Sequence, residues 1–463
     1  MTNWRPRLGG AARAAGTRGR PDRGARQPLY ERIVDALAAD VVSGRLAPGV
    51  RLPTQRELAD QIGTTVATVT RAYAEAQRRG LVTATVGRGT FVRGQPSIAE
   101  PATTDLTVNF LTPAPFAGEL GSALRALESP AVLDALWRYG PYEGQPRHRE
   151  VGVAWLAQRG LQARAKEIVV TAGAQHGMLV ALATLTRPGD TVLVEALTYP
   201  GMKSVANHLH VRLVPVAMDG EGLRPDALQE AIARTGARVL YAMPALHNPT
   251  GITMSGGRRR AILDIVSSSG LQVIEDDQYG FLTDVPPLTA DAPDRGVYIN
   301  SISKSLLPGL RVAFLRAPAA LVPRIAAAVF ATAVMAPPFA VELLARWIEE
   351  GTAARVLAWK RSEYAARAAL ARRIFAIDTP TPVAPHVWLP LREGTTAADF
   401  VEEARLRGVR VNGSSAFLVA PGAPPAAVRV CLGPPASRET LERALRILEA
   451  VRVAPPSAHA AVV

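Results

Sequence analysis

Lysine is scarce in this chain, and one lysine stands among residues that suit a reactive site. Only four of the 53 basic residues are lysine, and Lys304 lies in SISKSLLPGLR with Ser301, Ser303 and Arg311. A lysine amine can lose its proton and attack a carbonyl, whereas a guanidinium cannot. Serine hydroxyls and a guanidinium are suited to hold a phosphate. The stretch predicts a Schiff-base lysine beside a phosphate site; the alternative is a lysine on a surface helix.

Three further candidates follow predicted strands, where open α/β sheets bind their ligands. After IVVT, the amides of Ala174 and Gln175 stand at a helix start, which attracts phosphate. The alternative there is a compact turn. Tyr199, after TVLVE, could stack on a planar ligand or lie at the surface before a proline turn. Asn248, in HNPTG, could donate to a ligand oxygen or form a plain Asn-Pro turn.

An acidic group ends another predicted strand, in LQVIEDDQYG. Glu275, Asp276 and Asp277 could bind magnesium, but no nucleotide-cradling P-loop accompanies them. The second interpretation is one carboxylate that faces a protonated ring nitrogen, with Tyr279 close behind. In chain order, the phosphate loop, stacking tyrosine, asparagine, carboxylate, lysine and arginine together describe a site for pyridoxal 5′-phosphate (PLP).

The elements that must position these residues alternate strand and helix from about residue 166. The runs EIVVT, TVLVE, VRLVPV, RVLYAM, LQVIE, VYINS and RVAFL are typical of strands buried on both faces of a mostly parallel sheet. The last run is a candidate antiparallel edge. We therefore expect a three-layer α/β domain with a seven-stranded sheet. Helices follow from about residue 318, and then a smaller α+β region.

Residues 28–93 predict three helices and a β-hairpin. Apolar residues recur every four positions from Leu29 to Val41, which indicates an amphipathic helix. TQRELADQIG has capping-box spacing and a closing glycine, and TTVATVTRAYAEAQRRG begins at Thr64 or Thr65. LVTATVGRGTFV is typical of two strands around a turn. The order is that of a winged helix-turn-helix, whose third helix enters the DNA major groove. The alternative is a small domain without a DNA partner.

Positive charge is concentrated at the N-terminus. The chain carries a net charge of +13, and residues 1–95 hold 16 arginines against 7 acidic residues. This excess favours a phosphate-backbone partner; coding bias explains arginine over lysine, but less well the local excess. Residues 1–26 are expected to be a disordered basic arm. Residues 94–108 form a Pro/Ser/Thr-rich linker that reaches on the order of 40 Å at ~3.3 Å per residue.

Several classes of protein are excluded or disfavoured by composition. No run approaches the ~20 apolar residues of a membrane span, and the start of the chain lacks a secretory apolar segment. The single Cys431 excludes an internal disulfide and fits a reducing compartment. We therefore expect a cytoplasmic protein that uses neither a membrane nor a metal.

The N-terminal domain resembles a known family. LPTQRELADQIG, TVTRAYAEAQRRGLV and GRGTFV are similar to the DNA-binding domain of the GntR family of bacterial regulators. Family members often have arginine where this chain has Val66, so one contact of the family is missing here. The resemblance implies DNA contacts from the second helix, the third helix and the wing, through Arg56, Thr65, Val66, Ala67, Thr68, Thr70, Gly87 and Arg88.

Residues 109–455 resemble fold-type I aminotransferases, most closely class I. The resemblance implies that Lys304 forms the Schiff base with PLP and that Asp276 pairs with its pyridine nitrogen. The other PLP contacts that it implies are Ala174, Gln175, Tyr199, Asn248, Tyr279, Ser301, Ser303 and Arg311. Arg429, in AVRVCLG, would bind a substrate carboxylate, and Tyr139, in YGPYEGQPRHR, would reach the partner subunit's phosphate in a dimer. His247 and Gln278 depart from the family pattern and could reshape the substrate pocket.

The order of the two domains resembles the MocR subfamily of bacterial transcription regulators. It implies a winged helix-turn-helix over residues 27–93, a PLP-binding domain over 109–455 and a flexible tail over 456–463. The implied protein is a homodimer that binds operator DNA and senses PLP, or an amine or amino-acid effector. One alternative is a working aminotransferase that carries a DNA-binding module. A third possibility is a vestigial PLP fold used only for dimerisation.

Overall fold

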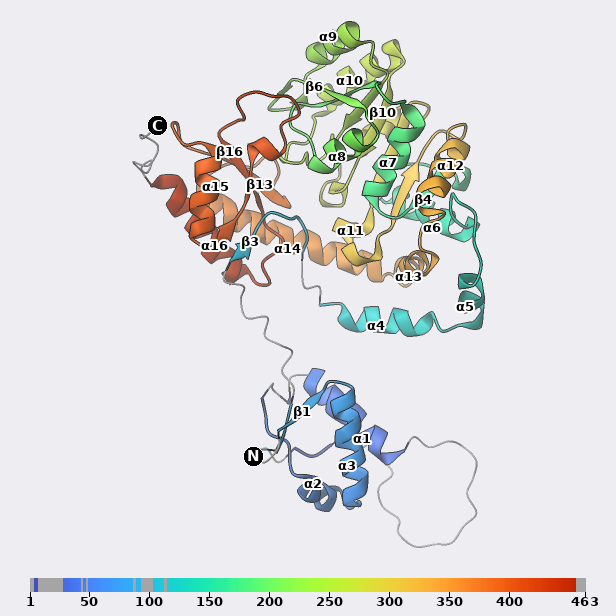
Figure 1. Ribbon diagram of the computed structural model, residues 1–463, viewed down its shortest axis with the longest axis vertical. Helices are drawn as coiled ribbons and strands as arrows, with labels where there is room; N and C mark the ends of the chain where they lie inside the picture. The colour runs from blue at the N-terminus through green and yellow to red at the C-terminus, as the bar shows by residue number, and fades with distance from the viewer. Residues whose placement is uncertain are drawn as a thin grey trace. The chain divides into compact units, whose positions relative to one another are not determined.

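The protein divides into two compact units, Met1–Ala102 and Thr103–Val463. The computed structural model describes residues 4–6, 28–42, 45–46, 49–85, 89–92, 103–111 and 115–454 (Figure 1). The larger unit already includes residues 103–108, which the sequence assigned to the linker. Residues 94–102 of the expected linker, most of the expected arm and the expected tail lie outside the described residues.

The smaller unit has the predicted order of elements. Its helices and strands are α1 (Leu29–Val42), α2 (Gln55–Ile62), α3 (Val66–Arg78), β1 (Val82–Thr85) and β2 (Gly89–Val92), and the two strands pair antiparallel. Thr54 and Glu57 form the expected capping box of α2, and Gly63 ends that helix at a φ of 69°. Thr65 caps α3 by accepting a hydrogen bond from the Thr68 amide.

The core of the smaller unit receives one residue that the sequence placed in a disordered arm. Trp4 is only 7% exposed and packs in the same cluster as Ile33, Leu37 and Val69. Its indole Nε1 donates to Asp40 Oδ2 over 2.9 Å. The expectation of disorder over residues 1–26 is therefore wrong for Trp4, because a buried indole gains apolar contacts and a hydrogen-bond partner.

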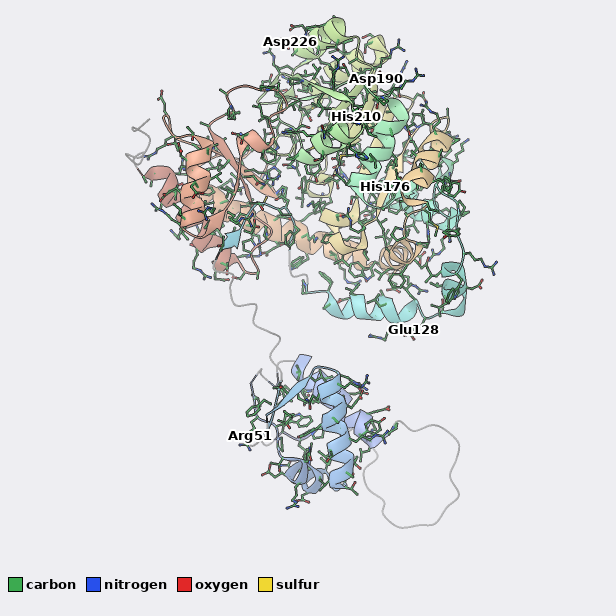
Figure 2. All side chains as sticks on the ribbon, viewed as in Figure 1. Arg51, Glu128, His176, Asp190, His210 and Asp226 are labelled. Atoms are coloured by element: carbon green, nitrogen blue, oxygen red, sulfur yellow. The ribbon has the colours of Figure 1, made fainter. Side chains whose placement is uncertain are left out.

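The segment before α2 joins the hairpin. Arg51, labelled in Figure 2, forms an antiparallel bridge with Phe91 of β2. Gly89, at a φ of +109°, leaves room for the Arg51 side chain, since a Cβ there would stand 2.8 Å from Arg51 Nε. The strand β2 is thus paired on both of its sides, with β1 and with the segment at Arg51.

The larger unit is built on a seven-stranded sheet with the order β4-β12-β11-β10-β9-β5-β6. These strands are β4 (Ile168–Thr171), β5 (Thr191–Glu195), β6 (Arg212–Val216), β9 (Val239–Ala242), β10 (Gln272–Asp276), β11 (Gly296–Ser301) and β12 (Ala313–Arg316). Within this sheet, β12 alone runs opposite to the other six strands, as expected. Its predicted place at an edge is wrong, because it lies between β4 and β11.

Helices cover both faces of this sheet (Figure 1). Alternate residues along a strand divide between the faces: Val169 packs in the cluster of α7, α8 and α12, whereas Ile168 and Val170 pack with α6 and α13. The helices before and around the sheet are α4 (Ala117–Ala126), α5 (Pro130–Leu136), α6 (Pro146–Ala157), α7 (Ala174–Leu185), α8 (Pro200–His208), α9 (Pro225–Thr235), α10 (Gly256–Ser269), α11 (Ile302–Ser305), α12 (Val322–Ala333) and α13 (Pro338–Glu349).

A smaller α+β subdomain follows through the long helix α14 (Thr352–Phe375). It contains β13 (His386–Pro390), α15 (Ala397–Leu406), β14 (Val409–Arg410), β15 (Asn412–Gly413), β16 (Ala427–Cys431) and α16 (Arg438–Val453). Its sheet has the order β13-β16-β15. The first strand of the larger unit, β3 (Thr104–Asp105), pairs in parallel with β14. A short hairpin, β7 (Met218–Asp219) and β8 (Gly222–Leu223), lies beyond β6.

Among the residues that the structure describes, no helix is both long enough and apolar enough to span a membrane.

Candidate functional site

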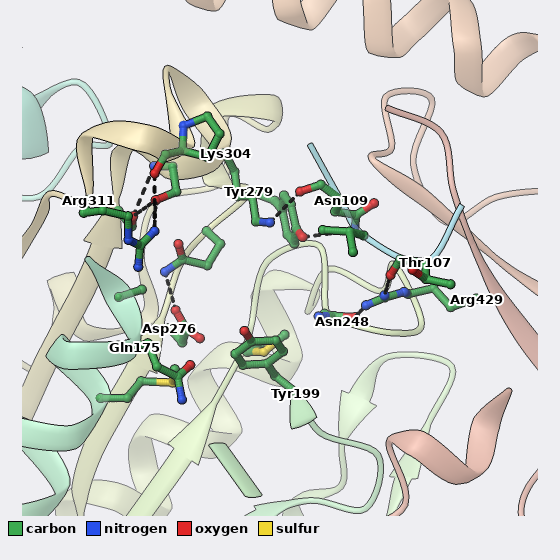
Figure 3. Close-up of a pocket in the computed structure, with 18 residues that line it drawn as sticks. Thr107, Asn109, Gln175, Tyr199, Asn248, Asp276, Tyr279, Lys304, Arg311 and Arg429 are labelled. Atoms are coloured by element: carbon green, nitrogen blue, oxygen red, sulfur yellow. Dashed lines mark hydrogen bonds between the residues drawn. The ribbon is translucent and has the colours of Figure 1, made fainter. Parts of the chain in front are cut away.

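A cavity of about 310 Å³ lies beyond the carboxyl ends of the parallel strands in the larger unit. Figure 3 shows Arg311 and Gln175 at one end of it and Arg429 with Thr107 at the other. The cavity brings together the predicted residues Ala174, Gln175, Tyr199, Asn248, Asp276, Tyr279, Ser301, Ser303, Lys304, Arg311 and Arg429. These residues come from five strand ends and the C-terminal subdomain, so only the folded sheet can assemble them.

One end of the cavity has the donors that an anion needs. Arg311 Nη1 donates to Ser303 Oγ over 3.0 Å, and the Ser303 amide and Ser301 Oγ are linked over 3.1 Å. The start of α7 lies at the same end, with Ala174 and Gln175 lining the cavity. A guanidinium, two hydroxyls and the positive end of a 12-residue helix are together suited to a phosphate.

Gly173 leaves the space that Arg311 occupies at this end of the cavity. It caps α7 with a φ of +88°, and a Cβ there would stand 2.5 Å from Arg311 Nη2. A side chain at this position would be strained in backbone conformation and would also displace the guanidinium. The small residue that the sequence places before the predicted phosphate loop is therefore required by Arg311.

A buried carboxylate lies in the middle of the cavity wall. Asp276 ends β10, accepts a hydrogen bond from Tyr241 OH over 2.7 Å and another from Gln278 Nε2 over 2.5 Å. Burial raises the pKa of Asp276 to about 6, although these two hydrogen bonds act in the opposite direction. A nearby positive charge would stabilise the ionised form of this buried carboxylate. Tyr199, at the start of α8, also lines the cavity.

The opposite end of the cavity carries a second guanidinium. Arg429 Nη1 donates to Asn248 Oδ1 over 2.7 Å, and Arg429 Nη2 donates to the Thr107 carbonyl. The guanidinium also lies over the Phe417 ring, 4.8 Å from its centre. Because Asn248 Oδ1 is occupied by Arg429, the amide Nδ2 of Asn248 is the group left for a ligand oxygen.

Lys304 has the properties of a nucleophilic amine. Its Nζ donates to the Asn109 carbonyl over 2.5 Å. Burial lowers the pKa of Lys304 to about 8, with Arg429 and Arg311 acting in the same direction. A second buried lysine supports the helix α11 behind it, since Lys360 Nζ donates to the carbonyls of Lys304 and Leu306 over 3.0 and 2.8 Å.

Sequence reasoning missed a polar network around Lys304. Asn109 Nδ2 donates to Tyr279 OH over 3.0 Å and lies 2.8 Å from His386 Nδ1. Because an amide NH₂ can only donate, His386 Nδ1 is the acceptor, and its Nε2 faces the His247 carbonyl at 3.2 Å. Burial lowers the pKa of His386 to about 3, so this histidine is neutral. The only sequence signal for His386 was its place at the start of HVWLPL.

The cavity fits PLP on its own geometry. Asn109 Oδ1 and Arg429 Nε are buried atoms without a hydrogen-bond partner among the described residues, and both residues line the cavity. The cavity thus has a phosphate end, a buried carboxylate, an amine with a lowered pKa and unpaired polar atoms at the far end. This set of donors and acceptors matches a planar phosphorylated ring that carries an aldehyde.

The residues predicted to bind DNA lie on α2 and α3. Arg56, Thr65, Val66, Ala67 and Thr70 are exposed, and Thr68 is half-buried. The wing residues Gly87 and Arg88 lie outside the described residues. Tyr139 does not line the cavity of its own chain and is 85% exposed. Its role in a partner's site stays a prediction.

The fold and the cavity define a class: an aminotransferase fold of type I, the fold of PLP-dependent enzymes, behind a winged helix-turn-helix. Comparison with known families agrees on both parts. Residues 121–448 match the family "Aminotransferase class I and II", and residues 29–92 match "Bacterial regulatory proteins, gntR family". The chain belongs to the GntR-type regulators whose C-terminal domain is a class I/II aminotransferase domain, which is the MocR architecture.

Individual relatives include both transcription regulators and an aminotransferase. The chain is 32% identical over 441 residues, 92% of its length and 94% of the relative's, to the HTH-type transcriptional regulator YdeF of Bacillus subtilis. It is 29% identical to the vitamin B6 salvage pathway transcriptional repressor PtsJ of Salmonella typhimurium, over 61% of this chain and 66% of that one. Among solved structures, the α-aminoadipate aminotransferase LysN of Thermus thermophilus, complexed with N-(5′-phosphopyridoxyl)-L-leucine, matches with a TM-score of 0.68 and 25% identity. That match covers 76% of this chain and 92% of LysN.

Proposed function

We propose that this transcription regulator holds PLP in the cavity of its larger unit and senses PLP, or a carboxylated amine that reacts with it. The aldehyde of bound PLP condenses with primary amines, which gives the cavity its selectivity for such ligands. The chain's own groups would act as follows. Arg311 and the two serines hold the phosphate, Asp276 pairs with the ring nitrogen, and Lys304 supplies the resident amine.

The observation that carries this proposal is the course of the chain where it enters the larger unit. Just after β3, the Thr107 carbonyl accepts from Arg429 Nη2 and from Asn412 Nδ2, the latter over 2.9 Å. Two residues on, the Asn109 carbonyl accepts from Lys304 Nζ. The first segment of the larger unit is therefore bound to two cations that ligands of this cavity would also use (Figure 3).

Competition at these two cations gives a physical route from the cavity to the DNA-binding unit. A ligand carboxylate makes a stronger, charge-assisted contact with Arg429 than a neutral carbonyl does. With PLP bound, Lys304 would no longer be available to donate to the Asn109 carbonyl. Residues 107–109 follow β3, and residues 93–102 join β3 to β2 of the smaller unit. A ligand that binds the two arrangements of this entry segment unequally shifts their populations and so changes DNA binding.

We further propose that the protein is a homodimer in which Tyr139 contacts the partner's phosphate end. Trp137 and Tyr139 are 87% and 85% exposed, which is unusual for large aromatic side chains. Nearby, Tyr142 contacts Phe330 at 4.6 Å between ring centres, and Phe330 is half exposed. Sedimentation of Trp137→Glu against the original protein tests this: we expect a monomer, and a dimer of unchanged stability would contradict it.

The test of sensing uses the full chain and DNA from upstream of its own gene. A mobility shift at fixed salt, with and without PLP and with PLP plus a series of amino acids, should show a change in affinity. Lys304→Ala should bind DNA but lose the response. Specific DNA binding that is indifferent to PLP and to every amine would refute sensing while leaving DNA binding intact.

Substitutions at two glycines test whether the entry segment couples the cavity to DNA binding. A Cβ on Gly433 would stand 2.1 Å from the Phe110 carbonyl oxygen, a backbone atom of the entry segment. Gly433→Ala should therefore displace residues 107–110 and alter the DNA response without removing any ligand-binding side chain. Gly422→Ala is the matched control, because nothing lies within 4 Å of a Cβ there. Equal responses of the two variants would argue against the route.

The competing function is amino transfer by the same cavity. The buried Lys304, whose pKa is lowered to about 8, favours it because a neutral amine is also what transamination needs. Steady-state transfer of an amino group to a keto acid, lost in Lys304→Ala, would establish turnover. Binding of PLP and DNA without such transfer would support a sensor alone.

A further inference from the structure

The recognition helix presents an apolar residue at the position where helix-turn-helix proteins read bases. Val66 is the first residue of α3 and is 42% exposed. The helix buries its other side through Val69, Ala72, Tyr73 and Ala76. Val66 is thus not a core residue of this helix, and its side chain faces outward at the N-terminal end of α3, which enters the major groove in this class of domain.

The hydroxyl groups around Val66 are already used within the protein. Thr65 Oγ1 accepts from the Thr68 amide and lies 2.9 Å from Thr68 Oγ1. Thr70 Oγ1 lies 2.9 Å from both Gln55 Oε1 and the Val66 carbonyl, to which it can donate. Each of these hydroxyls therefore already has a hydrogen-bond partner within the protein.

The first turn of α3 exposes two apolar side chains, Val66 and Ala67. Val66 and Thr70 stand four residues apart and so lie on the same face of the helix, and Ala67 is exposed beside them. None of these three side chains can make the two parallel hydrogen bonds that select guanine or adenine. A purely apolar contact in the major groove has one suitable partner, because thymine alone presents a methyl group there.

We propose that α3 reads thymine methyl groups through Val66, so that each operator half-site carries thymine opposite this residue. The inference rests on the DNA binding proposed above and adds the type of base that is read. Polar readout and backbone contact fall to other residues, such as the exposed Arg56 of α2. Val66 contributes specificity without contributing to the electrostatic part of the affinity.

The experiment starts with selection of binding sites from random DNA by the full-length protein. Each thymine of the selected site is then replaced by deoxyuridine, which removes only the methyl group. We expect one thymine in each half-site at which the replacement weakens binding about four-fold, the effect of one buried methyl group. Replacement of that thymine by cytosine should weaken binding, and 5-methylcytosine should restore part of the loss.

Two variants assign the effect to Val66. Val66→Ala should reduce the ratio of the uridine and thymine dissociation constants at that position toward one. Its dependence on salt concentration should stay unchanged, because no phosphate contact is lost. Gln77→Ala is the control, since Gln77 is exposed near the C-terminal end of the same helix. Val66→Arg should shift the selected base at that position to guanine.

The possible results separate this inference from the proposed function. A selected site at which uridine is tolerated everywhere overturns methyl reading and leaves DNA binding intact. The same holds for a uridine effect that persists unchanged in Val66→Ala. Failure to enrich any sequence overturns DNA reading by α3 altogether, and with it the inference. A uridine effect that Val66→Ala abolishes and Gln77→Ala preserves supports the proposal.

Discussion

The lowered pKa of Lys304 makes a quantitative prediction about the attachment of PLP. Only the neutral amine attacks an aldehyde, so the second-order rate constant should follow the neutral fraction of Lys304 in the free protein. Burial lowers the pKa of this amine from 10.5 to about 8. At pH 7 the neutral fraction is then about 9%, against roughly 0.03% for an ordinary lysine. The structure therefore predicts attachment about 300-fold faster than to an exposed lysine of equal nucleophilicity.

The assay is rapid mixing of PLP-free protein with PLP, followed by absorbance, from pH 6 to pH 10. The rate constant should rise about tenfold per pH unit below 8 and level off above it. Lys304→Arg should abolish the fast phase, and Lys166→Arg should leave it unchanged, because Lys166 is exposed. Arg429→Leu should move the midpoint upward, since Arg429 helps to lower the pKa of Lys304. A midpoint near 10.5 in the original protein would refute the argument that burial activates this amine.

Three further substitutions have expected outcomes. Gly173→Ala should weaken PLP binding, measured by equilibrium dialysis, because the added Cβ would meet Arg311. It should also lower the free energy of unfolding in urea by about 1–3 kcal/mol, because residue 173 has a positive φ. Asp276→Asn should also weaken PLP binding, yet it should stabilise the PLP-free protein at pH 7 by up to about 3 kcal/mol. The sign follows from the pKa: burial raises that of Asp276 from 3.8 to about 6, so the ionised form is disfavoured in the fold and stability falls as pH rises between these values. Lys360→Met should slow PLP attachment, because α11 loses its support, while the urea midpoint changes little. Leaving two carbonyls without a partner lowers the free energy of unfolding of this variant by about 1–3 kcal/mol. Removing a buried amine, whose pKa is lowered to about 8, raises it. A large drop in the urea midpoint, with attachment unchanged, would contradict this assignment.

The sequence was sufficient for the parts of the site that follow strands directly. Candidates at the ends of β4, β5, β9, β10 and β11 were predicted to meet because parallel strands end at one edge of a sheet. Ala174, Gln175, Tyr199, Asn248, Asp276 and Lys304 all line the cavity, whereas Glu275 and Asp277 do not. Helix caps such as Thr54 and Gly63 were also predictable, since their partners lie within a few residues. The site residues themselves were assigned roles by resemblance, and those roles stay predictions.

Local sequence patterns could not indicate which residues far apart in the chain contact one another. Asn109 was expected at the boundary of the linker, yet it contacts Lys304 and His386, far along the chain. Tyr241 faces Asp276 because β9 and β10 are neighbours, a fact that no local pattern carries. Lys360, in the middle of a 24-residue helix, looks from sequence like a solvated lysine, but it is buried against α11. The inward place of β12 likewise depends on sheet order rather than on its own residues.

The burial of Trp4 sets an order for the synthesis of this protein. The indole leaves the ribosome before the hairpin does, but the cluster that receives it also contains Val82 and Val92 from the hairpin. The smaller unit therefore cannot complete its core until residue 92 has emerged, and Trp4 must wait for partners made much later. Loss of Trp4, or a bulky fusion placed directly before it, would interfere with the last step of this assembly. An affinity tag at the C-terminus avoids this risk.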